Sequence, residues 1–102
     1  MMNDLTGFQR DMLYIISGMG DPKGLSIKRG LQKDYDTEIN HGRLYPNLDD
    51  LVDRGYVEKG TKDRRTNEYS LTAQGRQLIK NRRQWEDDRL NADSKTKTAL
   101  KP

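Results

Sequence analysis

Apolar residues recur at helical spacing in the N-terminal part of the chain, in two stretches separated by a break. A first helix is predicted over residues 6–19, where Thr6 is placed to cap its start. Its apolar positions are Phe8, Met12, Ile15, Ile16 and Met19. The segment "GDPKG" then interrupts the pattern, because glycine and proline favour turns. A second helix opens at Gly24 or Ser26, and its inward side carries Ile27, Leu31 and Tyr35.

A third helix is predicted from about Asn40 to Arg54, although Pro46 falls inside it. Its apolar stripe consists of Leu44, Leu48, Leu51 and Val52, and Gly55 is a typical helix stop. A proline inside a helix costs about 3 kcal/mol, because it lacks an N–H and crowds the preceding turn. At about 100° per residue, however, Gly42 and Pro46 lie opposite the stripe, where water can satisfy the freed carbonyl. We therefore expect one mildly kinked helix; the alternative is a turn up to residue 45, with the helix starting at Pro46.

Two segments that favour β-structure follow and predict a hairpin. Residues 56–58 and 67–71 alternate and flank the polar, basic link "KGTKDRRT". The segment "LTAQGRQL" then opens a fourth helix with Thr72 as its N-cap. The apolar side of this helix carries Leu78, Ile79, Trp85 and Leu90. Residues 91–102 show no sustained period and end in scattered lysines, which predicts a disordered basic tail.

This order of elements predicts a winged helix-turn-helix, an α+β fold that is mostly helical. In that fold the third helix enters the DNA major groove and the hairpin, called the wing, flanks it. The chain is accordingly divided into a winged helix DNA-binding domain (residues 1–71), a C-terminal dimerisation helix (72–90) and the tail (91–102).

The charge distribution favours a polyanionic partner. The chain has 102 residues and a formal net charge of +3. Residues 1–71 hold 11 basic and 12 acidic side chains, whereas residues 72–102 hold 8 and 4. Residues 59–65 alone carry four basic side chains and one acid. Positive charge that is local in this way suits nucleic acid, and the plain alternative is a solvated surface.

Candidate DNA contacts gather at the start of the third helix and in the hairpin link. Gly42 and Pro46 leave a flat surface there, surrounded by the hydrogen-bonding groups of Asn40, His41, Arg43 and Asn47. Arginine suits guanine and asparagine suits adenine. Further cations that are placed to meet phosphate are Lys28, Lys59, Lys62, Arg64 and Arg65. The acids of the same helix, Asp49, Asp50 and Asp53, would repel phosphate and are expected to point away from DNA.

The segment "HGRLYPNLDDLVDRGYVEKG" resembles the PadR-like winged-helix transcriptional regulators. The matching positions are Gly42, Leu44-Tyr45-Pro46, Leu48, Leu51, Gly55 and Val57, followed by Tyr69, Leu71-Thr72 and Gly75. The resemblance covers about residues 6–90 and implies a dimeric transcription factor, usually a repressor, whose last helix makes the dimer. It also implies a role for Tyr45 near the DNA backbone. Arg43 is a departure, because the family often has a small residue there.

A lone tryptophan on a mostly charged helix predicts contact with a second copy of the chain. Leu78, Ile79 and Trp85 would form that contact, with Phe8 and Met12 of the first helix as the facing surface. The alternative is that Trp85 folds back on its own domain. Two domains would bind half-sites about 34 Å apart, which implies a near-palindromic operator. Trp85, with Phe8 and Met12, also offers a flat apolar slot for a planar small-molecule effector.

Other classes of function find little support. The chain has one histidine, His41, and no cysteine, so we expect no enzyme, no metal site and no cofactor. It has no apolar run of about 18 residues and no secretory leader, which predicts a cytoplasmic protein without a membrane span. The alternative to DNA binding is a winged-helix module that binds proteins instead, which the acidic half of the third helix favours.

Overall fold

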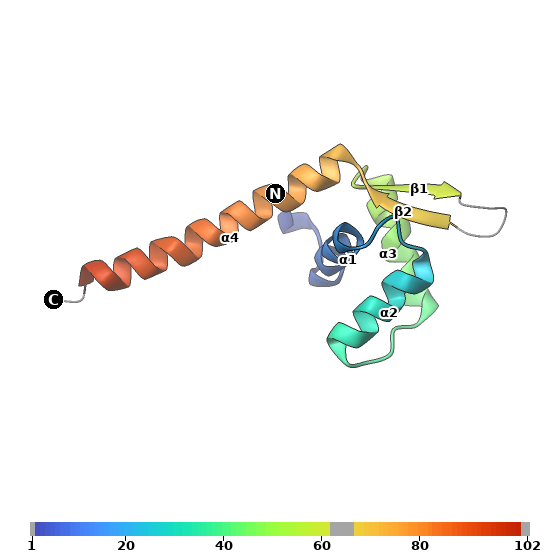
Figure 1. The fold of residues 1–102 in the computed structure, drawn as a ribbon, viewed down its shortest axis with the longest axis horizontal. Helices are drawn as coiled ribbons and strands as arrows, with labels where there is room; N and C mark the ends of the chain where they lie inside the picture. The colour runs from blue at the N-terminus through green and yellow to red at the C-terminus, as the bar shows by residue number, and fades with distance from the viewer. Residues whose placement is uncertain (1, 62–66, 101–102) are drawn as a thin grey trace.

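The computed structural model describes residues 2–61 and 67–100, and its elements follow the predicted order (Figure 1). Within these residues a short 3-10 helix, η1 (Met2–Asp4), precedes a helical domain with a hairpin and a long last helix. The elements are α1 (Gly7–Gly18), α2 (Gly24–Tyr35), α3 (His41–Asp53), β1 (Val57–Thr61), β2 (Asn67–Leu71) and α4 (Ala73–Leu100). The arrangement confirms the mostly helical winged helix-turn-helix.

Local hydrogen bonds explain where α1 begins and α2 ends. The side chain of Thr6 accepts the N–H of Gln9 at 3.1 Å, and the side chain of Gln9 accepts the N–H of Thr6 at 3.2 Å. This reciprocal capping box confirms Thr6 as the N-cap. At the other end of the helical pair, Asp36 adopts a left-handed backbone with φ of 52°, which stops α2 and turns the chain toward α3.

Helix α3 continues through Pro46, as predicted. Leu44, Leu48 and Leu51 are fully buried, whereas Pro46 is exposed on the outer side of the helix. Asn40 starts the helix, since its side-chain oxygen accepts the N–H of Arg43 at 2.9 Å. The burial of three leucines, at about 1.5–3 kcal/mol each, exceeds the cost of the one hydrogen bond that proline removes.

The hairpin is longer than predicted and is fastened to the helices. Strand β1 runs to Thr61 rather than ending at residue 58, because Lys59, Gly60 and Thr61 pair with Tyr69, Glu68 and Asn67 in an antiparallel register. A main-chain hydrogen bond of 2.9 Å from Tyr69 to Pro22, and a bridge between Lys23 and Glu68, join β2 to the segment before α2. The wing therefore keeps a fixed position beside α2 and α3.

A tight joint connects the hairpin to α4. Thr72 is the N-cap, as predicted: its Oγ1 accepts the N–H of Gly75 at 3.0 Å and donates to the carbonyl of Gly55 at 2.6 Å. The N–H of Thr72 also donates to the carbonyl of Tyr56 at 3.1 Å. A Cβ at Gly75 would lie 2.2 Å from that same carbonyl oxygen, so only glycine allows this approach. The start of α4 is thus anchored to the domain at several backbone atoms.

Helix α4 is longer than the predicted dimerisation helix. It extends to Leu100, which corrects the prediction of a disordered tail for residues 91–100; residues 101–102 lie outside the described part. The sequence from Arg76 to Lys101 contains no glycine or proline, so nothing in it forces the helix to end near Leu90. The helix projects away from the domain, and the molecule measures 64 × 30 × 23 Å (Figure 1).

Candidate nucleic-acid interface

The first turn of α3 is exposed and free of acidic residues. His41, Gly42 and Arg43 are all exposed, while the next residue, Leu44, is fully buried. No acid occurs in this turn of the helix. Since a helix N-terminus carries unpaired N–H groups and partial positive charge, this end of α3 is suited to an anionic partner.

Tyr45 connects this turn to the start of α2. The rings of His41 and Tyr45 are stacked, with centroids 5.5 Å apart and planes at 25°. The phenol of Tyr45 lies against Gly24, where a Cβ would come within 2.8 Å of its ring and hydroxyl oxygen. Glycine at the first position of α2 therefore makes room for Tyr45, which places a hydroxyl donor at a second helix N-terminus.

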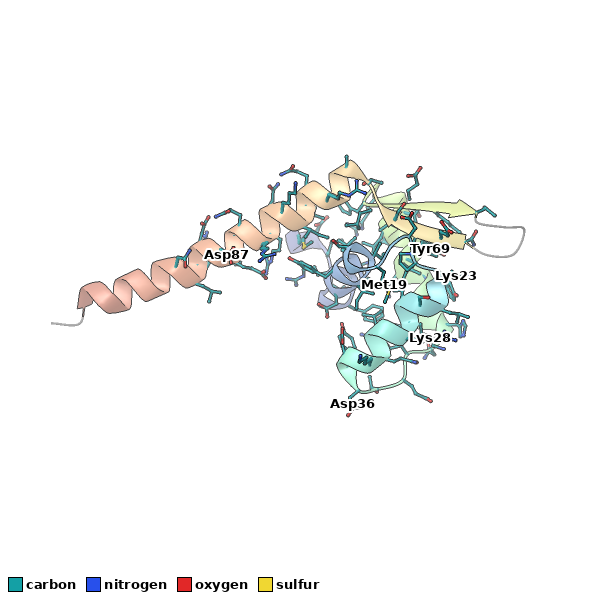
Figure 2. All side chains as sticks on the ribbon, viewed as in Figure 1. Met19, Lys23, Lys28, Asp36, Tyr69 and Asp87 are labelled. Carbon is teal, nitrogen blue, oxygen red and sulfur yellow. The ribbon has the colours of Figure 1, made fainter. Side chains whose placement is uncertain are left out.

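Basic side chains of α2 flank the same region. Figure 2 shows Lys23 and Lys28 at the end of α2 that lies toward the hairpin. Lys28 lines a hollow together with Asn40 and His41 of the α3 start. Gln32, one helical turn after Lys28, accepts the N–H of Ile39 at 3.0 Å and so holds the loop before α3 in place. The structure thus brings together five predicted residues: Lys28, Asn40, His41, Gly42 and Tyr45.

Two other predicted residues of α3 lie to one side of this group. The guanidinium carbon of Arg43 stands 4.0 Å from the centre of the Phe8 ring in α1. The amide nitrogen of Asn47 donates to the carbonyl of Arg43 at 2.7 Å, so part of the Asn47 amide is engaged by its own helix. Asn40 likewise uses its side-chain oxygen as a helix cap. With respect to the described residues, the guanidinium of Arg43, the amide nitrogen of Asn40, and the oxygen and second amide N–H of Asn47 stay available to a partner.

Two of the three acids in the second half of α3 have partners. Asp50 accepts from Arg54 at 2.9 Å and from Gln9 at 2.7 Å, and these hydrogen bonds, that of Arg54 first, hold the pKa of Asp50 below its ordinary value. Asp49 lies 3.9 Å from the Nζ of Lys59 on the wing. Sequence reasoning placed Lys59 at phosphate without detecting this pair. The other predicted wing contacts, Lys62, Arg64 and Arg65, lie outside the described residues.

The residues predicted to face a second copy are mostly core residues of the chain itself. Met12 is 0% exposed and Phe8 is 7% exposed, and both pack in the domain core. Leu78 and Ile79 are each 9% exposed and belong to the same core, so contact of these four residues with a second copy stays a prediction. The pattern could not separate these cases, because an apolar stripe fits a monomer core and an interface equally well.

Farther along α4, apolar side chains remain outside the core. Trp85 is half-buried, and the guanidinium carbons of Arg82 and Arg89 lie 4.4 and 4.7 Å from the centre of its ring. Leu90 is 67% exposed and Tyr14 of α1 is 38% exposed. Burial raises the pKa of Tyr14, with a further contribution from the carboxylate of Glu86 on α4. Tyr14, Trp85 and Leu90 line one hollow between α1 and α4, which we call the α4 hollow.

Metal and membrane chemistry find no site in the part of the chain that the structure describes. No group of three or more His, Cys, Asp or Glu side chains is arranged there to hold a metal ion. None of the described helices combines the length and the apolar character that crossing a bilayer requires.

Comparison with known proteins gives a family. A model of the PadR-like transcriptional regulators matches residues 12–81, while no curated protein matches the chain. A complex structure of hsRosR is 44% identical, with a TM-score of 0.85 over 95% of this chain and 86% of that one. RosR of H. salinarum is 39% identical, with a TM-score of 0.79 over 97% and 98%. A mutant MarR from E. coli complexed with operator DNA is 26% identical, with a TM-score of 0.65 over 76% and 53%. The chain therefore belongs to the PadR-like family of transcriptional regulators.

Proposed function

We propose that this regulator binds double-stranded DNA sequence-specifically, as a homodimeric repressor on a near-palindromic operator. One observation carries the proposal: the N-terminal turns of α2 and α3 meet at Tyr45, on an exposed surface flanked by Lys23, Lys28 and the wing. Such a surface offers N–H groups, a hydroxyl and ammonium groups to phosphate, while the first turn of α3 faces the base edges. MarR of E. coli, which shares the fold, is complexed with operator DNA, and this supports duplex DNA as the partner of this chain.

The second subunit is expected at the far part of α4. Leu90 and Trp85 leave apolar surface on a helix that extends well beyond the domain, and Tyr14 adds to it from α1. A self-complementary contact would bury this surface and set two α3 helices at a fixed separation. We also propose that a planar effector binds at this interface, in the α4 hollow lined by Tyr14, Trp85 and Leu90. A DNA ligand implies a cytoplasmic site of action.

A protein-interaction role remains the second candidate, because Asp53 and Asp49 present carboxylates on the outer side of α3. The acids of α3 would repel DNA phosphate, but the ion pairs Asp49–Lys59 and Asp50–Arg54 offset two of the three negative charges. This weakens the case for the protein-interaction role.

A mobility-shift titration separates the two candidates. The full chain is titrated against a random duplex at low salt and then against duplexes selected from a random pool. We expect retardation of the random duplex that weakens steeply as salt is raised, because each phosphate contact releases counterions. We also expect enrichment of a two-fold symmetric sequence. An intact dimer that retards neither duplex would favour the interaction module.

A further inference from the structure

We propose that Arg43 recognises a guanine in the operator and that Phe8, Tyr35 and Asp11, from α1 and α2, hold it in position. The inference rests on the proposed DNA-binding function, and it names the side chain that gives base preference together with those that orient it. These positioning residues come from helices outside the recognition helix, so periodicity along α3 gives no sign of them.

The contact with Phe8 holds the guanidinium of Arg43 against a ring of the domain core. The central carbon of Arg43 lies 4.0 Å from the ring centre, which is close enough for a cation–π contact. No hydrogen bond or ion pair to the described residues uses the guanidinium, and Arg43 is exposed. Its N–H donors are therefore available for an acceptor on the DNA. A stacked arginine has also lost part of its rotational freedom before binding, which lowers the entropy cost at the DNA.

Phe8 is a rigid platform for this contact. Its side chain is 7% exposed and belongs to the domain core. The ring of Tyr35 lies 6.1 Å away at 56°, a tilted arrangement that fixes the Phe8 ring from the α2 side. The position of Arg43 is therefore determined by the packing of α1 against α2 as well as by its place in α3.

Tyr35 also controls the acid that would otherwise compete for Arg43. The hydroxyl of Tyr35 donates to a carboxylate oxygen of Asp11. Burial raises the pKa of that hydroxyl, the charge of Asp11 raises it further and the charge of Arg43 lowers it. Asp11 and Arg43 form no ion pair with each other in the described structure, and one carboxylate oxygen of Asp11 is engaged by Tyr35. Arg43 thus keeps its donors for the DNA.

The place of Arg43 in α3 favours a base over a phosphate. It stands in the first turn, directly after Gly42, at the end of the helix that enters the groove in this fold. A guanidinium edge matches the O6 and N7 acceptors of guanine with two hydrogen bonds. Such a pair discriminates against other bases by roughly 5- to 150-fold, the equivalent of about 1–3 kcal/mol.

The experiment measures base discrimination by the full-length chain on duplexes selected from a random pool. For each variant, the readout is the ratio of Kd values between the selected duplex and duplexes with each guanine replaced in turn. Arg43→Ala should lose at least about 10-fold of this ratio at one guanine and leave the other positions unchanged. Phe8→Leu should lose part of the same ratio, and the double variant should match Arg43→Ala alone. A ratio at one position is insensitive to a general loss of folded protein.

A second pair of variants leaves the core intact. Tyr35→Phe keeps the ring against Phe8 and removes only the hydroxyl that engages Asp11. The freed carboxylate should then pair with Arg43 and reduce discrimination at the same guanine by several-fold. Asp11→Asn in the same chain should restore it, because the competing charge is gone.

The outcomes separate this inference from the proposed function. Unchanged preferences in Arg43→Ala, or equal weakening on every duplex, would overturn recognition of a base by Arg43. Positioning of Arg43 by Phe8, Tyr35 and Asp11 would be overturned by two results together. The losses of discrimination from Phe8→Leu and Arg43→Ala would multiply in the double variant, and Asp11→Asn would not restore discrimination to Tyr35→Phe. A wild-type dimer that binds no duplex would reject the DNA-binding function and this inference together.

Discussion

Single polar side chains fix the geometry of the α3 start before any partner arrives. Asn40 caps the helix with its oxygen, and Asn47 donates its amide nitrogen to the carbonyl of Arg43. A variant at either position therefore changes the helix as well as any contact with DNA. Arg43 differs, since among the described residues its guanidinium is held by its contact with the Phe8 ring alone. It is the residue of α3 whose removal reports most directly on recognition.

The contact between Tyr35 and Asp11 predicts an unusual titration. Burial, together with the hydrogen bond to Asp11 and its charge, raises the pKa of Tyr35 from 10.0 to about 12. Because the folded value lies above the ordinary one, the hydroxyl stabilises the fold fully below about pH 10, and this contribution is lost as the pH rises toward 12. Phenolate absorbance should show one tyrosine ionising near pH 12, and this step should be absent in Tyr35→Phe. In Asp11→Asn the step should move down toward pH 10, and an unchanged value there would contradict the contact.

The close contact of Gly75 with the carbonyl of Tyr56 predicts that one added methyl group at position 75 lowers the stability of the fold strongly. In Gly75→Ala the added carbon would meet the carbonyl oxygen of Tyr56, and relief requires α4 to move away from the hairpin. We expect the free energy of unfolding in urea to fall by about 2–4 kcal/mol. The matched control is Gly18→Ala, where no heavy atom lies within 4 Å of the new carbon. It should raise stability by up to about 1 kcal/mol, and an equal loss in both variants would contradict steric contact as the cause.

At the scale of elements, periodicity predicted the interior helices best. The leucines of α3 define one face so clearly that the helix could be drawn through Pro46. The end of β1 was missed because Lys59, Gly60 and Thr61 have low apolar content, and their pairing with β2 is decided by register across the hairpin. The packing of Phe8 in its own domain core was also missed, since whether an apolar stripe meets its own chain or a second one depends on how helices far apart in sequence pack.

The candidate DNA interface could likewise be predicted only where it depends on neighbouring residues in the sequence. The sequence predicted that the start of α3 would gather polar residues, because their types and order are local. The stack of Arg43 on Phe8 and the ion pair of Asp49 with Lys59 join residues that are distant in sequence, and no local pattern encodes them.

Pro46, on the outer face of α3, is expected to lower the free energy of unfolding. In Pro46→Ala the restored N–H can bond the carbonyl of Gly42, so we expect the free energy of unfolding to rise by about 1–3 kcal/mol. Asp53→Ala, on the same exposed side, should change it by no more than about 0.5 kcal/mol. Chemical denaturation measures both. A loss of stability in Pro46→Ala would mean that the kink is required for packing.

At the scale of the whole molecule, the far part of α4 lies beyond the domain, as the position of Asp87 illustrates (Figure 2). If a second copy covers the α4 hollow, a charge at Leu90 should separate the subunits. Leu90→Glu is expected to shift the chain from dimer to monomer in sedimentation velocity, and to weaken operator binding without changing the fold of the domain. Gln77→Glu, an exposed site nearer the domain, should leave the mass unchanged. A dimeric Leu90→Glu chain would place the interface elsewhere.

The rigid joint between hairpin and α4 has a consequence for evolution of target sites. A helix rotates by about 100° for each residue, so one alanine inserted between Ile79 and Trp85 would swing the outer portion of α4 around its axis while the DNA-contacting body stayed intact. In the proposed dimer, each half-site would keep its base sequence, while the distance and the phase between the two half-sites would change. On that proposal, a single codon insertion gives a descendant of this chain a new operator spacing without any change in base preference.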